Sequence, residues 1–62
     1  MEKLIEQYNK VFDPTGRILF CSKEECVKLI EMFEEKFPDV DFGNKGNGFL
    51  NANNLKEYRT KL

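Results

Sequence analysis

Residues 22–38, SKEECVKLIEMFEEKFP, contain the start, the apolar face and the end of one long helix. Ser22 and Glu25 form a capping box, in which the serine accepts a hydrogen bond from a free backbone N–H and the glutamate reaches back to another. Pro38 predicts the end of the helix at about Phe37, because the residue before a proline is pushed out of the helical conformation. The helical spacing predicts an inner face made of Cys26, Leu29, Ile30, Phe33 and Phe37.

The two cysteines of the chain lie at the start of this helix. Cys21 comes directly before the capping Ser22, and Cys26 stands at the fourth helical position, so the pair is predicted to pack as a hydrophobic staple. Zinc needs four ligands, usually Cys or His, and the chain has no His. A redox pair normally has two intervening residues, whereas these cysteines have four. A disulfide between them stays geometrically open, although a reducing cytoplasm disfavours it.

The segment before the long helix predicts a helix, a turn and a strand. From Glu2 to Phe12 the apolar residues share one helical face, which is typical of an amphipathic helix. Residues 13–16, Asp-Pro-Thr-Gly, fit a type I turn. Arg17 to Cys21, RILFC, is short and rich in strand formers, and predicts a buried strand.

The segment after the long helix predicts a strand, a loop and a short helix. Asp39 to Phe42 alternates polar and apolar residues, as a strand at a sheet edge does. Residues 43–48, GNKGNG, predict a loop, and residues 49–50, Phe-Leu, a further extended pair. Three asparagines can cap the last helix, namely Asn51, Asn53 and Asn54. The apolar side of that helix consists of Leu55, Tyr58 and Leu62.

These elements predict one small α+β domain over residues 1–62, in the order helix, strand, long helix, strand or extended segment, short helix. Forty per cent hydrophobic residues, with six Phe and two Tyr, are enough for one compact core. The predicted core is Leu4, Tyr8, Phe12, Ile18, Phe20, Leu29, Ile30, Phe33, Phe37 and Leu55.

An alternative fold comes from a resemblance. Residues 43–58, GNKGNGFLNANNLKEY, resemble the loop and helix of EF-hands and dockerin modules, and residues 11–22, VFDPTGRILFCS, have the same outline. The resemblance implies a degenerate all-α helix-loop-helix pair, with Ile18 and Leu50 facing each other across a small antiparallel bridge. The side-chain ligand positions of the later loop would be Gly43, Lys45, Asn47, Asn51 and Asn54. Because this set contains no carboxylate, we expect no calcium binding.

Composition and charge exclude several classes of function. The formal net charge is −1, so the chain as a whole has no electrostatic reason to bind nucleic acid or an anionic membrane. No apolar run approaches the length of a membrane span, about 18 residues. The N-terminal stretch MEKLIEQYNK is acidic and amphipathic, unlike a signal peptide, and predicts a cytoplasmic protein. Lysine exceeds arginine and there are six Asn, which favours an AT-rich source such as a phage or mobile element.

No catalytic, cofactor or metal site is predicted. Without His, acid–base chemistry would need carboxylates, Lys, Tyr or thiols. The carboxylates at the end of the long helix are interpreted as an exposed acidic patch rather than a cation site, and they are Glu31, Glu35, Asp39 and Asp41. We therefore expect a non-enzymatic protein.

The predicted function is a protein-interaction module, an inhibitor or adaptor that occupies a surface of a larger protein. Its expected partner-binding residues belong to the Gly/Asn loop and the helix after it, and they are Asn44, Lys45, Asn47, Asn51, Lys56 and Arg59. An alternative partner face on the long helix is acidic with apolar edges, and consists of Glu24, Val27, Glu31, Met32 and Glu35.

An alternative function is weak nucleic-acid binding through the same loop and the basic C-terminal helix. Residues 44–62 contain four cations and one acid, Glu57. Loop N–H groups and these cations could contact phosphates. Tyr58 could stack on a base, although its spacing with Leu55 favours the core.

Overall fold

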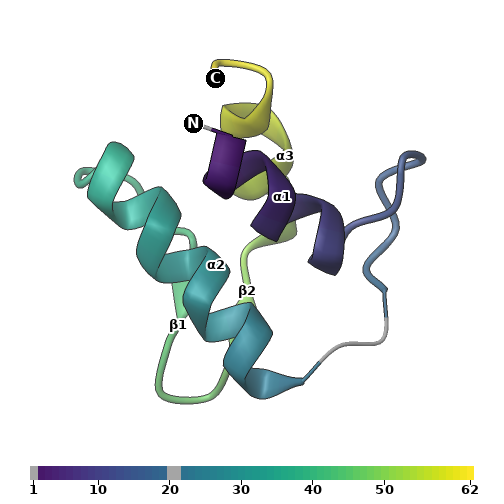
Figure 1. Cartoon of the computed structure of the whole chain (residues 1–62). Coiled ribbons are helices and arrows are strands. Elements are labelled where there is room, and N and C mark those ends of the chain that lie inside the picture. The colour runs from purple at the N-terminus through teal and green to yellow at the C-terminus, as the bar shows by residue number, and fades with distance from the viewer. Residues whose placement is uncertain (1, 20–21) are drawn as a thin grey trace.

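The computed structural model describes residues 2–19 and 22–62, which form three helices and a two-stranded antiparallel sheet. The elements are α1 (Glu2–Val11), α2 (Lys23–Lys36), β1 (Gly43–Asn44), β2 (Phe49–Leu50) and α3 (Ala52–Arg59). The two longer helices α1 and α2 pack against each other, and the hairpin of β1 and β2 contacts α2 (Figure 1). The small α+β domain predicted from the sequence is therefore confirmed. None of the described helices has the length and apolarity that crossing a membrane requires.

Local signals place the helix ends where the sequence predicts them. The Oγ atom of Ser22 accepts a hydrogen bond from the N–H of Glu25 at 3.3 Å, which caps α2. The side chain of Asn51 accepts from the N–H of Asn54 at 3.3 Å and caps α3. The helix α2 ends at Lys36, just before Phe37 and Pro38.

A buried amide joins the first two helices. The Gln7 side chain is 3% exposed, and its Nε2 donates to the main-chain oxygen of Glu25 at 3.0 Å and to its carboxylate at 3.1 Å. These bonds hold the middle of α1 against the first turn of α2.

The core lies between the helices and the hairpin. Its fully buried side chains are Phe12, Phe33, Phe42, Leu29, Ile30, Leu55 and Val11. The ring of Phe33 lies 5.0 Å from that of Phe42, and Phe42 meets Tyr58 edge-on at 5.5 Å. The predicted core positions that prove to be buried are Leu4, Tyr8, Phe12, Leu29, Ile30, Phe33 and Leu55. Phe37 is half-buried and packs at the edge of this core.

The prediction of a buried strand over Arg17–Cys21 is wrong for the described residues 17–19. Ile18 forms one isolated antiparallel bridge with Phe12, and the N–H of Leu19 donates to the carbonyl of Val11 at 2.7 Å. The chain therefore folds back along the end of α1, and Ile18 is 53% exposed instead of joining the core. Phe20 and Cys21, and with Cys21 the predicted cysteine staple, lie outside the described residues. Cys26 is buried.

The prediction of an edge strand over Asp39–Phe42 is also wrong. Residues 38–40 form a turn, with the N–H of Val40 donating to the carbonyl of Phe37 at 3.2 Å, and strand pairing begins only at Gly43. Phe42 is fully buried, because its ring packs against Phe33 of α2 and Tyr58 of α3. The expected extended pair Phe49–Leu50 is confirmed as β2.

The all-α alternative is wrong because each loop pairs within itself. Ile18 is bridged to Phe12, and Leu50 is paired with Gly43. The contact that EF-hand pairs make between their two loops is replaced by these two local pairings.

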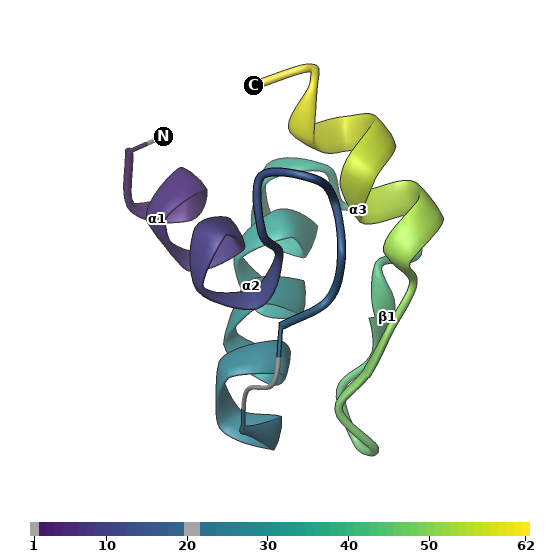
Figure 2. The same cartoon turned by 90° about the vertical axis from the view of Figure 1, so that its right-hand side faces the viewer.

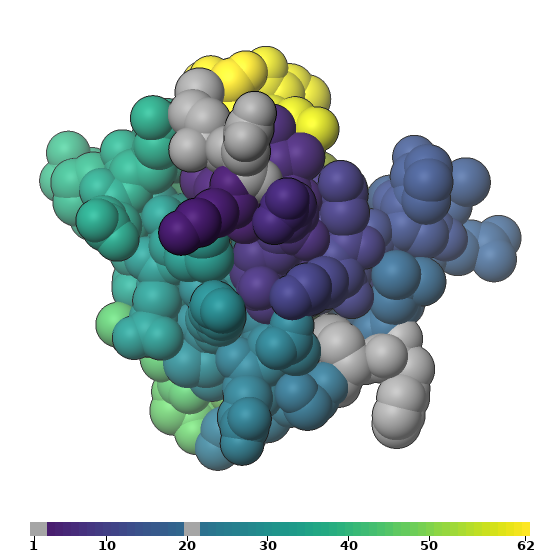
Figure 3. Space-filling view, in the orientation of Figure 1, coloured from purple at the N-terminus to yellow at the C-terminus, as the bar shows by residue number. Residues whose placement is uncertain are grey.

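The arrangement has two distinct ends. The start of α1 and the end of α3 lie at one end of the molecule, and the hairpin turn lies at the opposite end (Figures 1 and 2). Residues 13–19, which follow α1, project from the body beside α1 (Figure 3).

Candidate interaction site

The predicted Gly/Asn loop is a tight β-hairpin. Gly43 pairs with Leu50 and Asn44 with Phe49, so residues 45–48 form the turn. The N–H of Asn47 donates to the carbonyl of Asn44 at 3.3 Å, and Gly48 follows with a φ of +67°, a conformation that favours glycine.

The face of the hairpin toward α2 needs a glycine at position 43. Gly43 has a φ of +140°, and a Cβ placed there would collide with the carbonyl oxygen of Phe49 and lie 3.0 Å from Cδ1 of Ile30. The backbones of the two strands and α2 can therefore approach closely. Gly43 and its partner Leu50 share the inner face of the hairpin.

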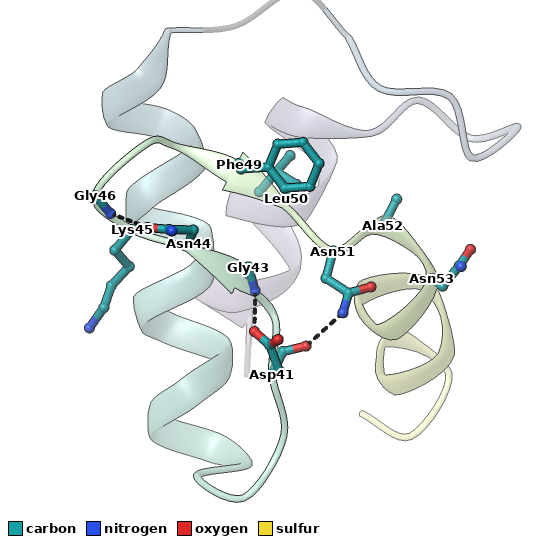
Figure 4. A pocket seen from close by; sticks show the side chains of 10 residues that line it. All are labelled: Asp41, Gly43, Asn44, Lys45, Gly46, Phe49, Leu50, Asn51, Ala52 and Asn53. Carbon is teal, nitrogen blue, oxygen red and sulfur yellow. Dashed lines mark hydrogen bonds between the residues drawn. The ribbon is translucent and has the colours of Figure 1, made fainter.

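Successive side chains of a strand point to opposite faces, so Asn44 and Phe49 lie on the outer face, away from α2. Phe49 is 70% exposed. It borders an open depression of about 760 Å³, which we call the hairpin depression (Figure 4). Its lining consists of Asp41, Gly43, Asn44, Lys45, Gly46, Phe49, Leu50, Asn51, Ala52 and Asn53.

Amide side chains fix the frame of this depression. The carbonyl oxygen of Asp41 accepts from Nδ2 of Asn51 at 3.1 Å and from Nδ2 of Asn54 at 2.7 Å. The Asp41 carboxylate accepts from the N–H of Gly43 at 3.0 Å. These bonds tie the segment before β1 to the start of α3 (Figure 4).

The turn of the hairpin is fixed in a similar way. Asn44 Oδ1 accepts from the N–H of Gly46 at 2.9 Å. Lys45 forms an ion pair with Glu34 of α2, with 3.0 Å between Nζ and Oε1. The hydrogen bond that Lys45 donates to the Glu34 carboxylate, together with the charge of that carboxylate, raises the pKa of Lys45 above its ordinary value of 10.5. The one cation of the turn is therefore compensated by α2.

The structure divides the six predicted partner-binding residues between two places. Asn44, Lys45 and Asn51 line the hairpin depression, and Asn47 is exposed in the turn beside it. Lys56 and Arg59 instead line a separate hollow between α1 and α3. The structure therefore places these two cations at a different hollow from the loop residues.

The alternative acidic face on α2 is mixed in charge. Its acids are Glu24, Glu31 and Glu35, all exposed, and Val27 is half-buried. Met32 and Glu35 line a groove between α1 and α2 together with Lys3 and Lys36. Lysines from both helices therefore interrupt the acidic surface at this groove.

Tyr58 belongs to the core rather than to a stacking surface. Its ring lies 4.9 Å from that of Phe37, and Nζ of Lys61 lies 4.7 Å from the centre of its ring. Within residues 2–19 and 22–62, no group of three or more His, Cys, Asp or Glu side chains is placed to hold a metal ion.

Sequence reasoning missed Phe49 as a candidate contact residue. The available signal was the hairpin itself. A four-residue turn over residues 45–48 places Phe49 opposite Asn44. Because successive side chains of a strand alternate, Phe49 and Leu50 then point to opposite faces. A loop over the whole of residues 43–48, as predicted, assigns no direction to the side chain of Phe49.

No family model matches the chain, and neither the curated proteins nor the solved structures contain a significant match.

Proposed function

We propose that this chain is a non-enzymatic protein-interaction module, an inhibitor or adaptor in the cytoplasm, which binds its partner through the outer face of the β-hairpin. The observation that carries this proposal is the 70% exposure of Phe49 beside the hairpin depression. Aromatic residues, phenylalanine included, are enriched in protein interfaces relative to the rest of the protein surface. In a chain this small, a largely solvated Phe on an ordered strand marks a surface suited to burial against another protein.

Rigidity of the surrounding frame supports the proposal. The hydrogen bonds of Asn44, Asn51 and Asn54, together with the ion pair of Lys45, hold the backbone on both sides of Phe49. A surface that is already ordered loses less conformational entropy on binding than a flexible loop does.

The chemistry of the surface indicates the kind of partner. Around Phe49 the depression offers the amide side chains of Asn44, Asn51 and Asn53, and the charge of Lys45 is compensated by Glu34. Such a face suits a folded protein that receives Phe49 in an apolar pocket and meets the amides with polar backbone groups. It has no charge pattern that would favour a strongly acidic or basic partner.

Affinity capture from cells of the natural source tests the proposal. The parent chain and two variants, Phe49→Ser and Ile18→Ser, are used as bait, and bound proteins are identified by mass spectrometry. Both residues are exposed, at 70% and 53%, so each substitution should change the free energy of unfolding by about 1 kcal/mol or less. We expect a partner that the parent and Ile18→Ser retain and Phe49→Ser loses.

A third bait separates the two candidate faces. The double variant Glu31→Lys, Glu35→Lys reverses the charge of the acidic face on α2 and leaves the hairpin unchanged. If this variant loses the partner while Phe49→Ser keeps it, the acidic face is the interaction site and the hairpin proposal is wrong.

A further inference from the structure

A hollow of about 310 Å³ lies between α1, the turn after it and α3, on a different surface from the hairpin depression. We call it the cationic hollow. Side chains from all three segments line it, including Tyr8, Asn9, Asp13, Lys56 and Arg59. It is several times larger than the volume of one water molecule in the liquid, about 30 Å³.

Two cations of α3 line this hollow. Lys56 and Arg59 are three residues apart on α3, so they share a helix face, and like charges at that spacing repel each other. Neither cation forms an ion pair with a carboxylate of the described residues. The ion pair among those residues joins Lys45 and Glu34, away from this hollow. A bound anion would remove this repulsion.

Each of the two cations lies beside a different segment. The guanidinium carbon of Arg59 lies 5.6 Å from the centre of the Tyr8 ring. The Lys56 side chain lies along Gly16, where a Cβ would be 3.4 Å from Cε and 3.6 Å from Nζ. Arg59 therefore lies over a ring of α1, and Lys56 lies beside the turn after α1.

Tyr8 contributes a further donor to the hollow. The phenol oxygen of Tyr8 forms no hydrogen bond with the described residues. Among these residues, every buried side-chain nitrogen or oxygen atom has a hydrogen-bond partner. The hydroxyl of Tyr8 must therefore reach solvent, although the residue as a whole is only 8% exposed. It can donate to a ligand in the hollow.

One acid also lines the hollow. Oδ1 of Asp13 accepts from the N–H of Thr15, from its hydroxyl and from the N–H of Arg17, at 3.0, 2.7 and 2.8 Å. These local bonds partly satisfy the carboxylate. Counting Lys56 and Arg59 against Asp13, the lining has a net charge of +1.

We propose that the cationic hollow binds a single phosphate group, from inorganic phosphate or a small phosphate monoester. A guanidinium, an ammonium and a phenol offer donors to several oxygens of one tetrahedral dianion. The site fits one phosphate rather than a nucleic-acid backbone, because the other two cations of residues 44–62 are engaged elsewhere: Lys45 pairs with Glu34, and Lys61 lies over the ring of Tyr58. This proposal does not depend on the hairpin surface.

The test is an NMR titration of the ¹⁵N-labelled chain with sodium phosphate at constant ionic strength, set by sodium chloride. We expect saturable shifts confined to amides around the hollow, such as those of Asn9, Gly16 and Thr60. Lys56→Gln, which alters an exposed side chain, should weaken binding by about tenfold, the usual value of one charge-assisted hydrogen bond. Lys61→Gln is the matched control and should keep the affinity within about twofold.

Two further arms decide the outcome. Asp13→Asn keeps an oxygen acceptor for the turn but removes a negative charge, so it should tighten phosphate binding. Phosphoserine should bind as inorganic phosphate does, and a single-stranded oligonucleotide no more tightly. The proposal is overturned if the shifts fail to saturate with phosphate, or if Lys56→Gln leaves the phosphate affinity unchanged. It is also overturned if the oligonucleotide binds far more tightly than phosphate and binds the Lys56→Gln variant equally well.

Discussion

Gly43 is the residue on which the hairpin most directly depends. Its φ of +140° is rarely adopted by residues with a side chain, and the space for a Cβ is filled by the carbonyl oxygen of Phe49 and by Ile30. We expect Gly43→Ala to lower the free energy of unfolding by about 3 kcal/mol or more, because backbone strain and a steric clash add together. Urea unfolding followed by circular dichroism measures this.

Gly46→Ala is the matched control for that measurement. Gly46 has no positive φ, and a Cβ there would meet only Oδ1 of Asn44, at 3.2 Å. The change should cost about 1 kcal/mol or less. Equal losses for the two variants would show that the hairpin adapts and that its backbone geometry is not fixed by Gly43.

Asp13 controls the element that reverses the chain after α1. Its carboxylate accepts from Thr15 and Arg17, and the hydroxyl of Thr15 is the largest cause of a pKa below the ordinary value of 3.8. The folded state therefore binds fewer protons than the unfolded state near this pH. The resulting stabilisation is present above the unfolded pKa and is lost as the pH falls through the folded pKa.

Thr15→Val tests this pH dependence. Loss of the 2.7 Å hydrogen bond should move the pKa of Asp13 up toward 3.8, and stability should then decrease less between about pH 5 and pH 2. Side-chain carboxyl titration by NMR, combined with urea unfolding at both pH values, measures the two effects. A parent pKa at or above 3.8 would contradict the role given to these bonds.

Helix ends were predictable because their signals are local. Ser22 and Asn51 each cap a helix through a bond to the residue three positions ahead, and Pro38 acts on its immediate neighbour. Strands depend on which segments meet. Ile18, predicted in a buried strand, is therefore exposed because the chain folds back beside α1. Phe42, predicted at a sheet edge, is instead buried between α2 and α3.

The candidate site was predictable in composition but not in arrangement. The sequence indicated the Gly/Asn segment, and Asn44, Lys45 and Asn51 do line the depression there. It could not separate Lys56 and Arg59 from them, because the side of α3 that meets α1 is decided by the packing of the whole chain. The hydrogen bond from Gln7 to Glu25 likewise joins residues far apart in the sequence, and the sequence pattern did not predict it.

At the scale of the whole molecule, side-chain oxygens in and beside the hairpin are engaged in hydrogen bonds that stabilise the fold. Oxygens of Asp41, Asn44 and Asn51 accept hydrogen bonds from backbone N–H groups. We therefore expect millimolar calcium chloride and chelators such as EDTA to leave the melting temperature unchanged, since a ligand that binds only the folded state would raise it. An increase of several degrees with calcium, absent with magnesium, would contradict this expectation.

The opposite placement of the chain ends and the hairpin turn determines how the molecule can be handled. A fluorophore, an affinity tag or a surface anchor attached after α3 or before α1 lies at the end remote from residues 45–48 (Figures 1 and 2). Molecules anchored in this way would all extend the hairpin toward the solution. The same geometry would let the domain be spliced into an exposed loop of a host protein and displayed from it as a compact protrusion.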